Sequence, residues 1–248
     1  MNIWIIKNYA KSLFIIITSF LHLFSLDAKN RIVDESCSTN YPYYFPAVNH
    51  QYKFVWFRVH KVATSTMNQI FKRNNVSFPI FIRHPSREHL DIRSYKNYFR
   101  FGFVRNPWDR VVSCYINRVV GKNTAEHSDL KECFDKDFDY FVDFLDRQDL
   151  TQANRHVMLQ TALIPVGQVD FIGKLENFSE DLQYVLNQIG LNDREIKKNK
   201  GIPKANATKH KHYSQFYTKR TQAIIARKYK DDIEAFGYEF EYNGNSPF

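Results

Sequence analysis

Runs of apolar and aromatic residues alternate along the chain with polar turns and helical patterns. The run Tyr52–Val59 is rich in β-branched and aromatic residues and predicts a buried strand. A polar turn, His60–Ser65, comes next, and Thr66–Arg73 predicts the opening of a helix. The same order begins again at Phe99–Val104, which predicts a second strand, and the apolar spacing over Trp108–Val120 predicts a second helix.

The remaining patterns continue this alternation of strands and helices. They predict a helix over Phe138–Leu145, a strand over Val169–Gly173, a helix over Ser179–Ile189 that Ser179 caps and Gly190 ends, a basic loop over Ile196–Lys211, and a long amphipathic helix over Ser214–Phe236. Such alternation is typical of a parallel sheet with helices on its faces. We therefore expect one α/β domain over residues 51–245, preceded by an irregular lead-in at 31–50.

Composition is consistent with a single packed domain. The chain has 248 residues, of which 44% are hydrophobic and 16% aromatic, enough for one well-packed core. The formal net charge of +9 favours anionic partners, but polyanions, anionic membranes and phosphate-rich cofactors all meet that condition. The three cysteines, Cys37, Cys114 and Cys133, have no zinc-site spacing. We expect three free thiols, with a Cys114–Cys133 bridge as the alternative in an oxidising compartment.

The first thirty residues have the pattern of a membrane-targeting segment. Lys7 and Lys11 precede the apolar run Ser12–Leu26, and polar residues follow it. The run is shorter than the roughly 20 residues of a comfortable membrane span. We expect either a cleaved signal peptide or a short type II signal anchor. In a secretory lumen, Asn75, Asn177 and Asn206 would be candidate glycan acceptors.

The turn after the first predicted strand has the chemistry of an anion site. A turn that enters a helix leaves backbone N–H groups unpaired, and the helix dipole adds positive charge there. Lys61 contributes a full charge, and three hydroxyl side chains follow it. The candidate anion-binding residues are Lys61, Val62, Ala63, Thr64, Ser65 and Thr66. The usual glycine-rich phosphate loop is absent, because no glycine precedes Gly102.

A second anion site follows the second predicted strand. Arg105 lies at the carboxyl end of that strand, where open α/β sheets bind ligands, and a guanidinium can hold a phosphate with two parallel hydrogen bonds. Pro107 suits the first position of the following helix. Ser113 lies about two helical turns further along, on the same side as Arg105. Asp109 and Arg110 are candidates for a local ion pair, and we expect Arg110 to be structural.

These motifs resemble those of the membrane-associated, carbohydrate-type (family 2) sulfotransferases. The Lys61 turn is similar to their 5′-phosphosulfate loop, and Phe103–Ser113 is similar to their 3′-phosphate segment. The stretch Asp170–Glu176 and the tail from His212 to Phe240 also agree, so the resemblance runs in patches from about 54 to 240. It implies a P-loop NTPase-like fold in one domain and a metal-free transfer of a sulfuryl group.

The resemblance also implies the donor and the roles of the site residues. The donor would be 3′-phosphoadenosine 5′-phosphosulfate, held by Lys61 and the hydroxyls and amides after it, with Arg105 and Ser113 on the 3′-phosphate. Lys61 would stabilise the departing oxygen. A histidine near neutral pH suits removal of the acceptor proton, and the family often places one upstream of the second segment. We expect His84 to be this base, with His89 as the alternative.

The acceptor is expected to be a carbohydrate hydroxyl, on a glycan that could be acidic because Arg83, Arg87, Arg93 and Lys96 are basic. The expected partners are this acceptor and, through the N-terminal segment, a membrane, with no nucleic acid. The expected location is the Golgi lumen as a type II protein if the source is eukaryotic, and otherwise secreted or membrane-bound.

Two alternatives from other functional classes stay open from the residues alone. A lumenal glycosyltransferase would use acidic residues such as Asp135, Asp137 and Asp139 to hold a metal-bound sugar nucleotide, although we expect these acids to lie at a helix start. A non-catalytic polyanion-binding protein would account for the charge, but not for two anion sites on two strand-to-helix turns.

Overall fold

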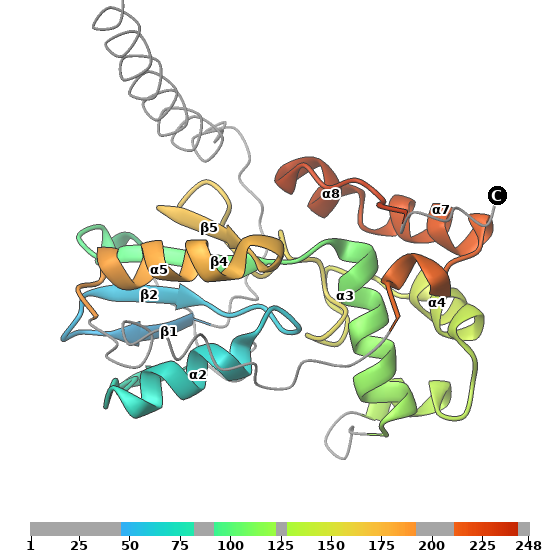
Figure 1. Ribbon diagram of the computed structural model, residues 1–248, viewed down its shortest axis with the longest axis horizontal. Coiled ribbons are helices and arrows are strands. Elements are labelled where there is room, and N and C mark those ends of the chain that lie inside the picture. Colours follow the sequence, from blue (N-terminus) through green and yellow to red (C-terminus); the bar gives the residue numbers. More distant parts are fainter. Residues whose placement is uncertain (1–45, 82–91, 123–127, 192–210, 243–248) are drawn as a thin grey trace, which may run out of the picture. The chain divides into compact units, whose positions relative to one another are not determined.

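The computed structural model describes residues 46–81, 92–122, 128–191 and 211–242 (Figure 1). Its single sheet has five strands in the order β3-β1-β2-β4-β5. The strands are β1 (Pro46–Asn49), β2 (Phe54–Phe57), β3 (Ile80–Phe81), β4 (Phe99–Val104) and β5 (Phe171–Lys174). Strands β2, β4 and β5 run parallel, while β1 is antiparallel to both β2 and β3. The predicted α/β class and its parallel sheet are confirmed.

The central strands are apolar because helices and loops cover both of their faces. All four residues of β2 are buried, and so are the last four of β4, as expected for parallel strands buried on both sides. The ring of Phe54 lies 5.4 Å from that of Phe71 on helix α2 and 5.7 Å from that of Phe101 on β4. These aromatic contacts join the sheet to the first helix.

Strand β1 lies in the segment that we expected to be an irregular lead-in. Only Ala47 and Val48 are apolar there, so the local pattern is too weak to predict a strand. The strand forms because it pairs with β2: Pro46 to Asn49 are in antiparallel register with Phe57 to Phe54. Asn49 stabilises this end, accepting from Tyr52 N at 2.6 Å and donating to Ser77 O at 2.7 Å.

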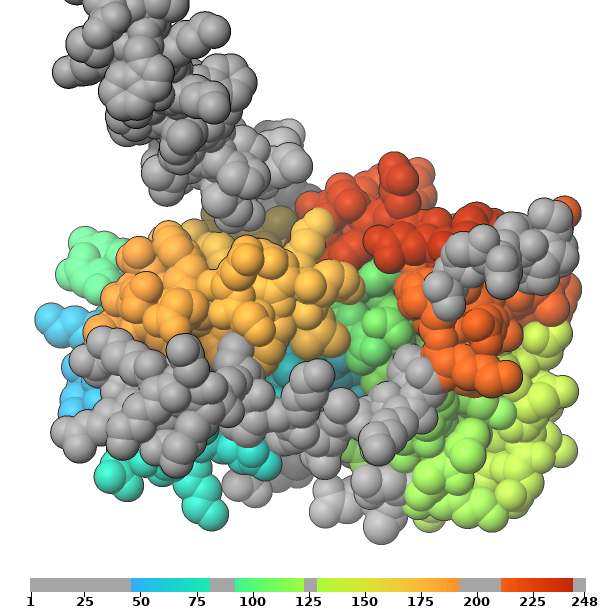
Figure 2. Space-filling model, in the orientation of Figure 1, coloured from blue at the N-terminus to red at the C-terminus, as the bar shows by residue number. Residues whose placement is uncertain are grey.

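The helices follow the predicted order with several changed boundaries. They are α2 (Thr64–Arg73), α3 (Pro107–Cys114), the π-helical η2 (Tyr115–Val120), α4 (Phe138–Arg147), α5 (Phe178–Gln188), α7 (Lys219–Lys228) and α8 (Lys230–Phe236), with short 3₁₀ turns η1 (Ile92–Tyr95), η3 (Ser128–Cys133), η4 (Leu175–Asn177) and η5 (Tyr213–Phe216). Helix α5 packs on β5, and α3 and α4 both pack on α7. On the face seen in Figure 2, α5 lies on one side and η5 with α7 on the other.

Two predicted helices are interrupted. The helix expected over Trp108–Val120 changes from α to π winding after Cys114. The helix expected over Ser214–Phe236 is three pieces, because Thr218 restarts it with a capping box to Thr221, and α7 and α8 meet at Tyr229. Tyr229 is fully buried, and its hydroxyl donates to Val157 O at 2.5 Å. Tertiary contacts therefore override a continuous amphipathic pattern.

Further predictions concern the two ends of α5, the cysteines and a membrane-spanning helix. Ser179 lies inside α5 instead of capping it, because the 3₁₀ turn η4 leads directly into the helix. Gly190 follows the end of α5 with φ of +66°, as expected of a helix-terminating glycine. Cys114 and Cys133 are free thiols. In the described part of the chain, no helix is both long and apolar enough to cross a membrane, and the segment 1–30 lies outside it.

Gly173 of β5 sets the distance between the third parallel strand and the aromatic core. A Cβ atom there would lie 2.4 Å from Phe103 Cε1, whereas a Cβ at Gly102 would first meet the flexible end of Ile164. We predict that Gly173→Ala lowers the free energy of unfolding by about 1–3 kcal/mol, more than Gly102→Ala does, and that Phe103→Leu recovers part of the loss. Urea unfolding of the variants measures this; equal losses at the two glycines would contradict it.

Candidate functional site

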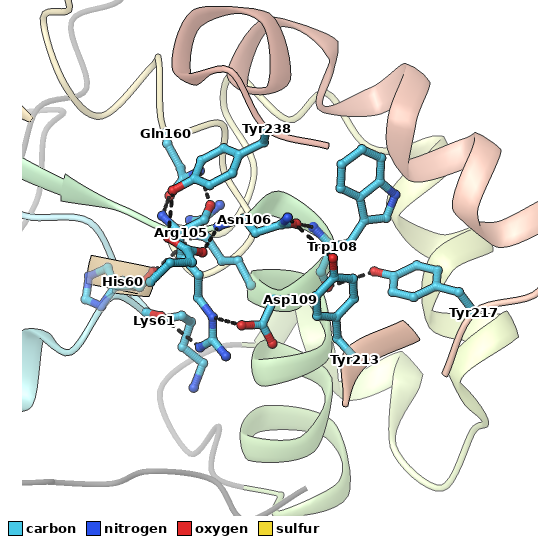
Figure 3. Close-up of polar contacts among 12 residues, drawn as sticks. His60, Lys61, Arg105, Asn106, Trp108, Asp109, Gln160, Tyr213, Tyr217 and Tyr238 are labelled. Atoms are coloured by element: carbon cyan, nitrogen blue, oxygen red, sulfur yellow. Dashed lines mark hydrogen bonds and ion pairs between the residues drawn. The ribbon is translucent and has the colours of Figure 1, made fainter. Parts of the chain in front are cut away.

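The two predicted anion turns meet at one edge of the sheet. Each follows a parallel strand, the first β2 and the second β4, and these strands are neighbours. The carboxyl ends of neighbouring parallel strands lie side by side, so the turns converge. A guanidinium nitrogen of Arg105, Nη1, donates to the backbone oxygen of Lys61 at 3.1 Å (Figure 3). This contact joins the two turns directly.

The first turn forms an open helix N-terminus without glycine. Lys61 and Ala63 have φ of 72° and 59°, in the left-handed region that glycine usually occupies. Ala63 precedes α2, and no side chain caps this helix or places an acid in its first turn. The amides at the start of a ten-residue helix therefore face the site with the positive end of the dipole.

The hydroxyl residues of the turn have different environments. Thr64 Oγ1 donates to Val59 O at 2.5 Å, so this hydroxyl closes the turn on itself. Thr66 is buried within the helix, with 3% of its surface exposed, whereas Ser65 is exposed. Val62 is buried in the core. The side chains of Val62, Thr64 and Thr66 are therefore buried or hydrogen-bonded within the protein. Lys61 and the backbone amides of the turn are the predicted anion-binding groups whose orientation toward a ligand is best defined.

The Lys61 ammonium lies in a strongly positive environment. Its Nζ donates to Asn117 Oδ1 of η2 at 2.7 Å. Burial is the main cause that lowers the pKa of Lys61 from 10.5 to about 8. Cys114 opposes this effect, and the charges of Arg118, Arg105 and Arg110 add to it. A bound anion would favour the protonated form, so Lys61 is suited to hold or donate a proton next to a phosphate or sulfate oxygen.

The second turn holds Arg105 from several sides. Asn106 caps α3 by accepting from Trp108 N at 3.1 Å, and Pro107 occupies the first turn, as predicted. The Arg105 guanidinium pairs with Asp109, Nε to Oδ2 at 2.7 Å, so the alternative pairing of Asp109 with Arg110 is wrong. The i, i+4 spacing on one helix face explains the choice. The guanidinium of Arg105 therefore points to the first turn, while the backbone of Arg105 forms the start of the second turn.

Arg110 is structural, as expected. It is 1% exposed and donates to three backbone oxygens, of His60 at 3.1 Å, Met158 at 2.7 Å and Arg155 at 3.4 Å. Burial is the main cause that lowers its pKa. The side chain therefore ties the first turn to the segment that follows α4, and it adds positive charge beneath the site.

Gln160 and Asp232 hold the backbone of Arg105 in place, and neither residue lies in a sequence pattern that predicts this role. Gln160 Oε1 accepts from Arg105 N, and its Nε2 donates to Arg105 O, both at 2.9 Å. Asp232 of α8 in turn accepts from Gln160 N at 2.9 Å and from Thr161 N at 2.8 Å. Gln160 and Asp232 are fully buried, and burial raises the pKa of Asp232. The backbone of Arg105 is thereby fixed through the C-terminal helix.

Glu176 links the third parallel strand to the same turn. Its Oε1 accepts from Asn106 N at 2.7 Å, and its Oε2 accepts from the Tyr238 hydroxyl at 3.0 Å. Asn106 also donates to Glu239 O at 2.8 Å. The stretch Asp170–Glu176 and the chain end near Glu239, both singled out in the sequence, therefore converge on the Arg105 turn.

A cavity of about 270 Å³ opens next to Arg105. The residues that line it come from the second turn and from the C-terminal tail: Arg105, Asn106, Asp109, Glu176, Lys211, His212, Tyr213 and Glu241. Ser113 lies further along α3 and is 5% exposed. The cavity offers room for part of a ligand whose anionic group contacts Arg105.

A histidine pair borders the first turn. The rings of His60 and His156 lie 4.6 Å apart. Asn154 Nδ2 donates to Asp129 Oδ1, so Asn154 Oδ1 is the acceptor for His156 Nδ1–H at 2.8 Å, and His156 Nε2 accepts from Arg118 Nη2 at 2.7 Å. Burial and nearby arginines hold the pKa of each histidine well below its usual value. The predicted bases His84 and His89 lie outside the described residues.

The acidic residues that a metal-dependent glycosyltransferase would need are used elsewhere. Asp137 caps α4 by accepting from Tyr140 N at 2.8 Å, Asp139 pairs with Arg220, and Asp135 pairs with Lys122. The predicted location at a helix start holds for Asp137 and Asp139, whereas Asp135 lies in the turn that precedes α4. Among the residues that the structure describes, no three His, Cys, Asp or Glu side chains form a group that could hold a metal ion.

Two comparisons with known proteins relate the chain to sulfotransferases. The model of the sulfotransferase family (Sulfotransfer_2) matches residues 47–239. Carbohydrate sulfotransferase 14 of Danio rerio is 25% identical over an alignment of 175 positions, and the alignment covers 58% of this chain and 47% of that relative. The chain thus matches about half the length of this relative. No solved structure matches significantly.

The amide of Gln160 generates a testable prediction. Gln160→Ala leaves the N–H and C=O of Arg105 without their partners, and each lost partner costs about 1–3 kcal/mol. We expect a lower free energy of unfolding in urea and weaker binding of an adenosine bisphosphate, whereas the matched variant Gln188→Ala, on the exposed end of α5, leaves both unchanged. Unchanged nucleotide affinity in Gln160→Ala would contradict the role of Gln160.

The pKa of Lys61 predicts a pH dependence of stability. Between about pH 8 and pH 10.5 the unfolded chain retains a proton that native Lys61 has lost, so this residue makes stability rise with pH in that window. The difference in unfolding free energy between the native sequence and Lys61→Met, measured in urea from pH 7.5 to 9.5, should therefore change in favour of the native sequence. Parallel curves would show that the pKa is not lowered.

Proposed function

The chain belongs to the sulfotransferase family, and we propose that it transfers a sulfuryl group from 3′-phosphoadenosine 5′-phosphosulfate to a hydroxyl group of a carbohydrate. The observation that carries this proposal is the contact between the two anion turns, in which Arg105 donates to the backbone of Lys61. One turn suits a 5′-phosphosulfate and the other a 3′-phosphate, and their contact brings both within reach of one nucleotide.

The described residues fit such a donor. The uncapped start of α2 supplies amide donors, and the first turn of this helix contains no acid that would repel an anion. Lys61 and Arg105 supply positive charge on either side of the junction. The cavity beside Arg105 provides space for the nucleoside. In this proposal Ser113 completes the 3′-phosphate site, as the family resemblance implies.

Lys61 would have the largest part in the transfer. Acceptor oxygen, sulfur and departing phosphate oxygen must lie roughly in line, so catalysis depends on positioning and on stabilising charge. With its pKa lowered to about 8, Lys61 can stabilise the departing oxygen and give it a proton. The turn amides and the hydroxyls of Thr64, Ser65 and Thr66 would orient the donor. No metal ion takes part in this proposal.

The acceptor proton requires a base, for which we retain His84, with His89 as the alternative. Neither described histidine near Lys61 suits this part. Both nitrogens of His156 are engaged, and the low pKa of His60 makes it a weak base. If turnover is unchanged when His84 and His89 are both replaced, the base is another residue.

The carbohydrate acceptor is proposed from the name of the Danio rerio relative. An acidic glycan would suit the positive charge of the chain. Attachment to a membrane through residues 1–30, and a Golgi lumenal location in a eukaryotic source, remain part of the proposal.

Calorimetry with 3′-phosphoadenosine 5′-phosphate tests the donor site on the full chain in detergent. We expect binding that AMP does not reproduce, because AMP lacks the 3′-phosphate. Arg105→Ala should weaken binding at least about 30-fold, the equivalent of about 2 kcal/mol for hydrogen bonds to a charged group. The matched variant Arg147→Ala, on the exposed surface, should bind normally.

Two results would contradict the proposal. One is the absence of nucleotide binding by a folded protein, which would favour a non-catalytic polyanion-binding relative. The other is equal binding of AMP and the bisphosphate.

A further inference from the structure

One face of the α3–η2 helix contacts both anion turns. Asp109, Ser113 and Asn117 follow one another at intervals of four residues along it. Asp109 holds the Arg105 guanidinium, and Asn117 accepts from the Lys61 ammonium. The α3–η2 helix thus binds each turn through a polar side chain, Asp109 from α3 and Asn117 from η2. Asn117 was not singled out in the sequence.

Asn117 makes its contact with Lys61 from a π-helical segment, η2, which continues α3 after Cys114. Its Oδ1 lies 2.7 Å from Lys61 Nζ, across 56 residues of sequence. Short π-helical segments are frequent at functional sites.

We propose that Asn117 is a positioning residue for sulfuryl transfer, whose side-chain oxygen holds the Lys61 ammonium at the junction of the two turns, directed to the departing oxygen of the donor. This inference rests on the proposed function. Asn117 acts through Lys61 and does not itself contact the reacting atoms.

The charges around Lys61 explain why the acceptor is an amide. The groups that face the ammonium are Arg105 from the second turn, Arg110 and Cys114 from α3, Arg118 from η2, and His156 from the segment after α4. The arginines disfavour the protonated form, which a hydrogen-bond acceptor favours. A carboxylate here would neutralise Lys61 and repel an anionic donor. The neutral Asn117 oxygen orients the ammonium and leaves its charge for the donor.

Replacements at Asn117 separate this role from a purely structural contact. Asn117→Ala removes the acceptor, Asn117→Gln keeps an amide, and Asn117→Asp substitutes a carboxylate. Asn187, on the exposed surface of α5, provides the matched controls Asn187→Ala and Asn187→Asp. The pKa of Lys61 is read by ¹³C NMR of reductively methylated protein, with Lys61→Arg assigning the signal, and kcat and KM for the donor are measured against pH.

We expect Asn117→Ala to lower the pKa of Lys61 by about one unit, to shift the alkaline limb of the kcat profile down equally, and to lower kcat about tenfold. The KM of the donor should change much less. Asn117→Gln should recover part of kcat. Asn117→Asp should raise the pKa of Lys61 and weaken binding of 3′-phosphoadenosine 5′-phosphate. The Asn187 variants should leave every value unchanged.

The proposal is overturned if neither Asn117→Ala nor Asn117→Asp moves the pKa of Lys61, or if kcat and its pH profile stay at native values while transfer proceeds. The proposed function is judged separately, by whether the native chain transfers a sulfuryl group. If the Asn117 substitutions shift the pKa of Lys61 but the native chain transfers no sulfuryl group, the contact is supported and the proposed function is contradicted. If Asn117→Ala does not fold, Asn117→Gln and Asn117→Asp decide the same question.

Discussion

The parallel pairing of β2 with β4 is the constraint on which the rest of the site depends. It places the two strand-to-helix turns next to each other, although 44 residues separate Lys61 from Arg105 in the contact that joins them. Without this pairing, each turn would be an ordinary helix start with a nearby cation. With it, one guanidinium contacts the backbone of the other turn, and the two positive helix ends share one space.

Positive charges that lie close together in a partly buried site destabilise one another. Burial is the main cause that lowers the pKa of Lys61, and the nearby Arg105, Arg110 and Arg118 lower it further. Oxygen acceptors around the arginine head groups offset this repulsion. Arg110 binds three carbonyl oxygens, and Arg105 binds Asp109 and a carbonyl oxygen. Part of the attraction for an anion is therefore present before the anion arrives, which is the meaning of preorganisation here.

The features predictable from sequence were those with a local pattern. Apolar runs marked β2 and β4, and the polar turns after them marked Lys61 and Arg105, because strand, turn and helix cap each follow from neighbouring residues. Gln160, Asp232, Asn117 and His156 gave no such signal, since each contacts the site through a residue 38 to 72 positions away. Strand β1 and the break at Tyr229 were missed for the same reason: pairing and burial, not periodicity, decide them. The break at Thr218 is different, because its capping box with Thr221 is a local feature that the amphipathic pattern across it obscured.

The support of Arg105 by distant segments has a consequence for the order in which the protein matures. Asp232 lies 72 residues beyond Gln160, and Glu239 lies 133 residues beyond Asn106. During synthesis the sheet strands and α2 emerge first, and they can pair before α8 exists. The arginine turn reaches its final form only when the last helix docks. A nascent or shortened chain would thus have a nearly complete sheet while the Arg105 turn still lacked its supporting contacts, and the two turns would reach their final arrangement only at the end of folding.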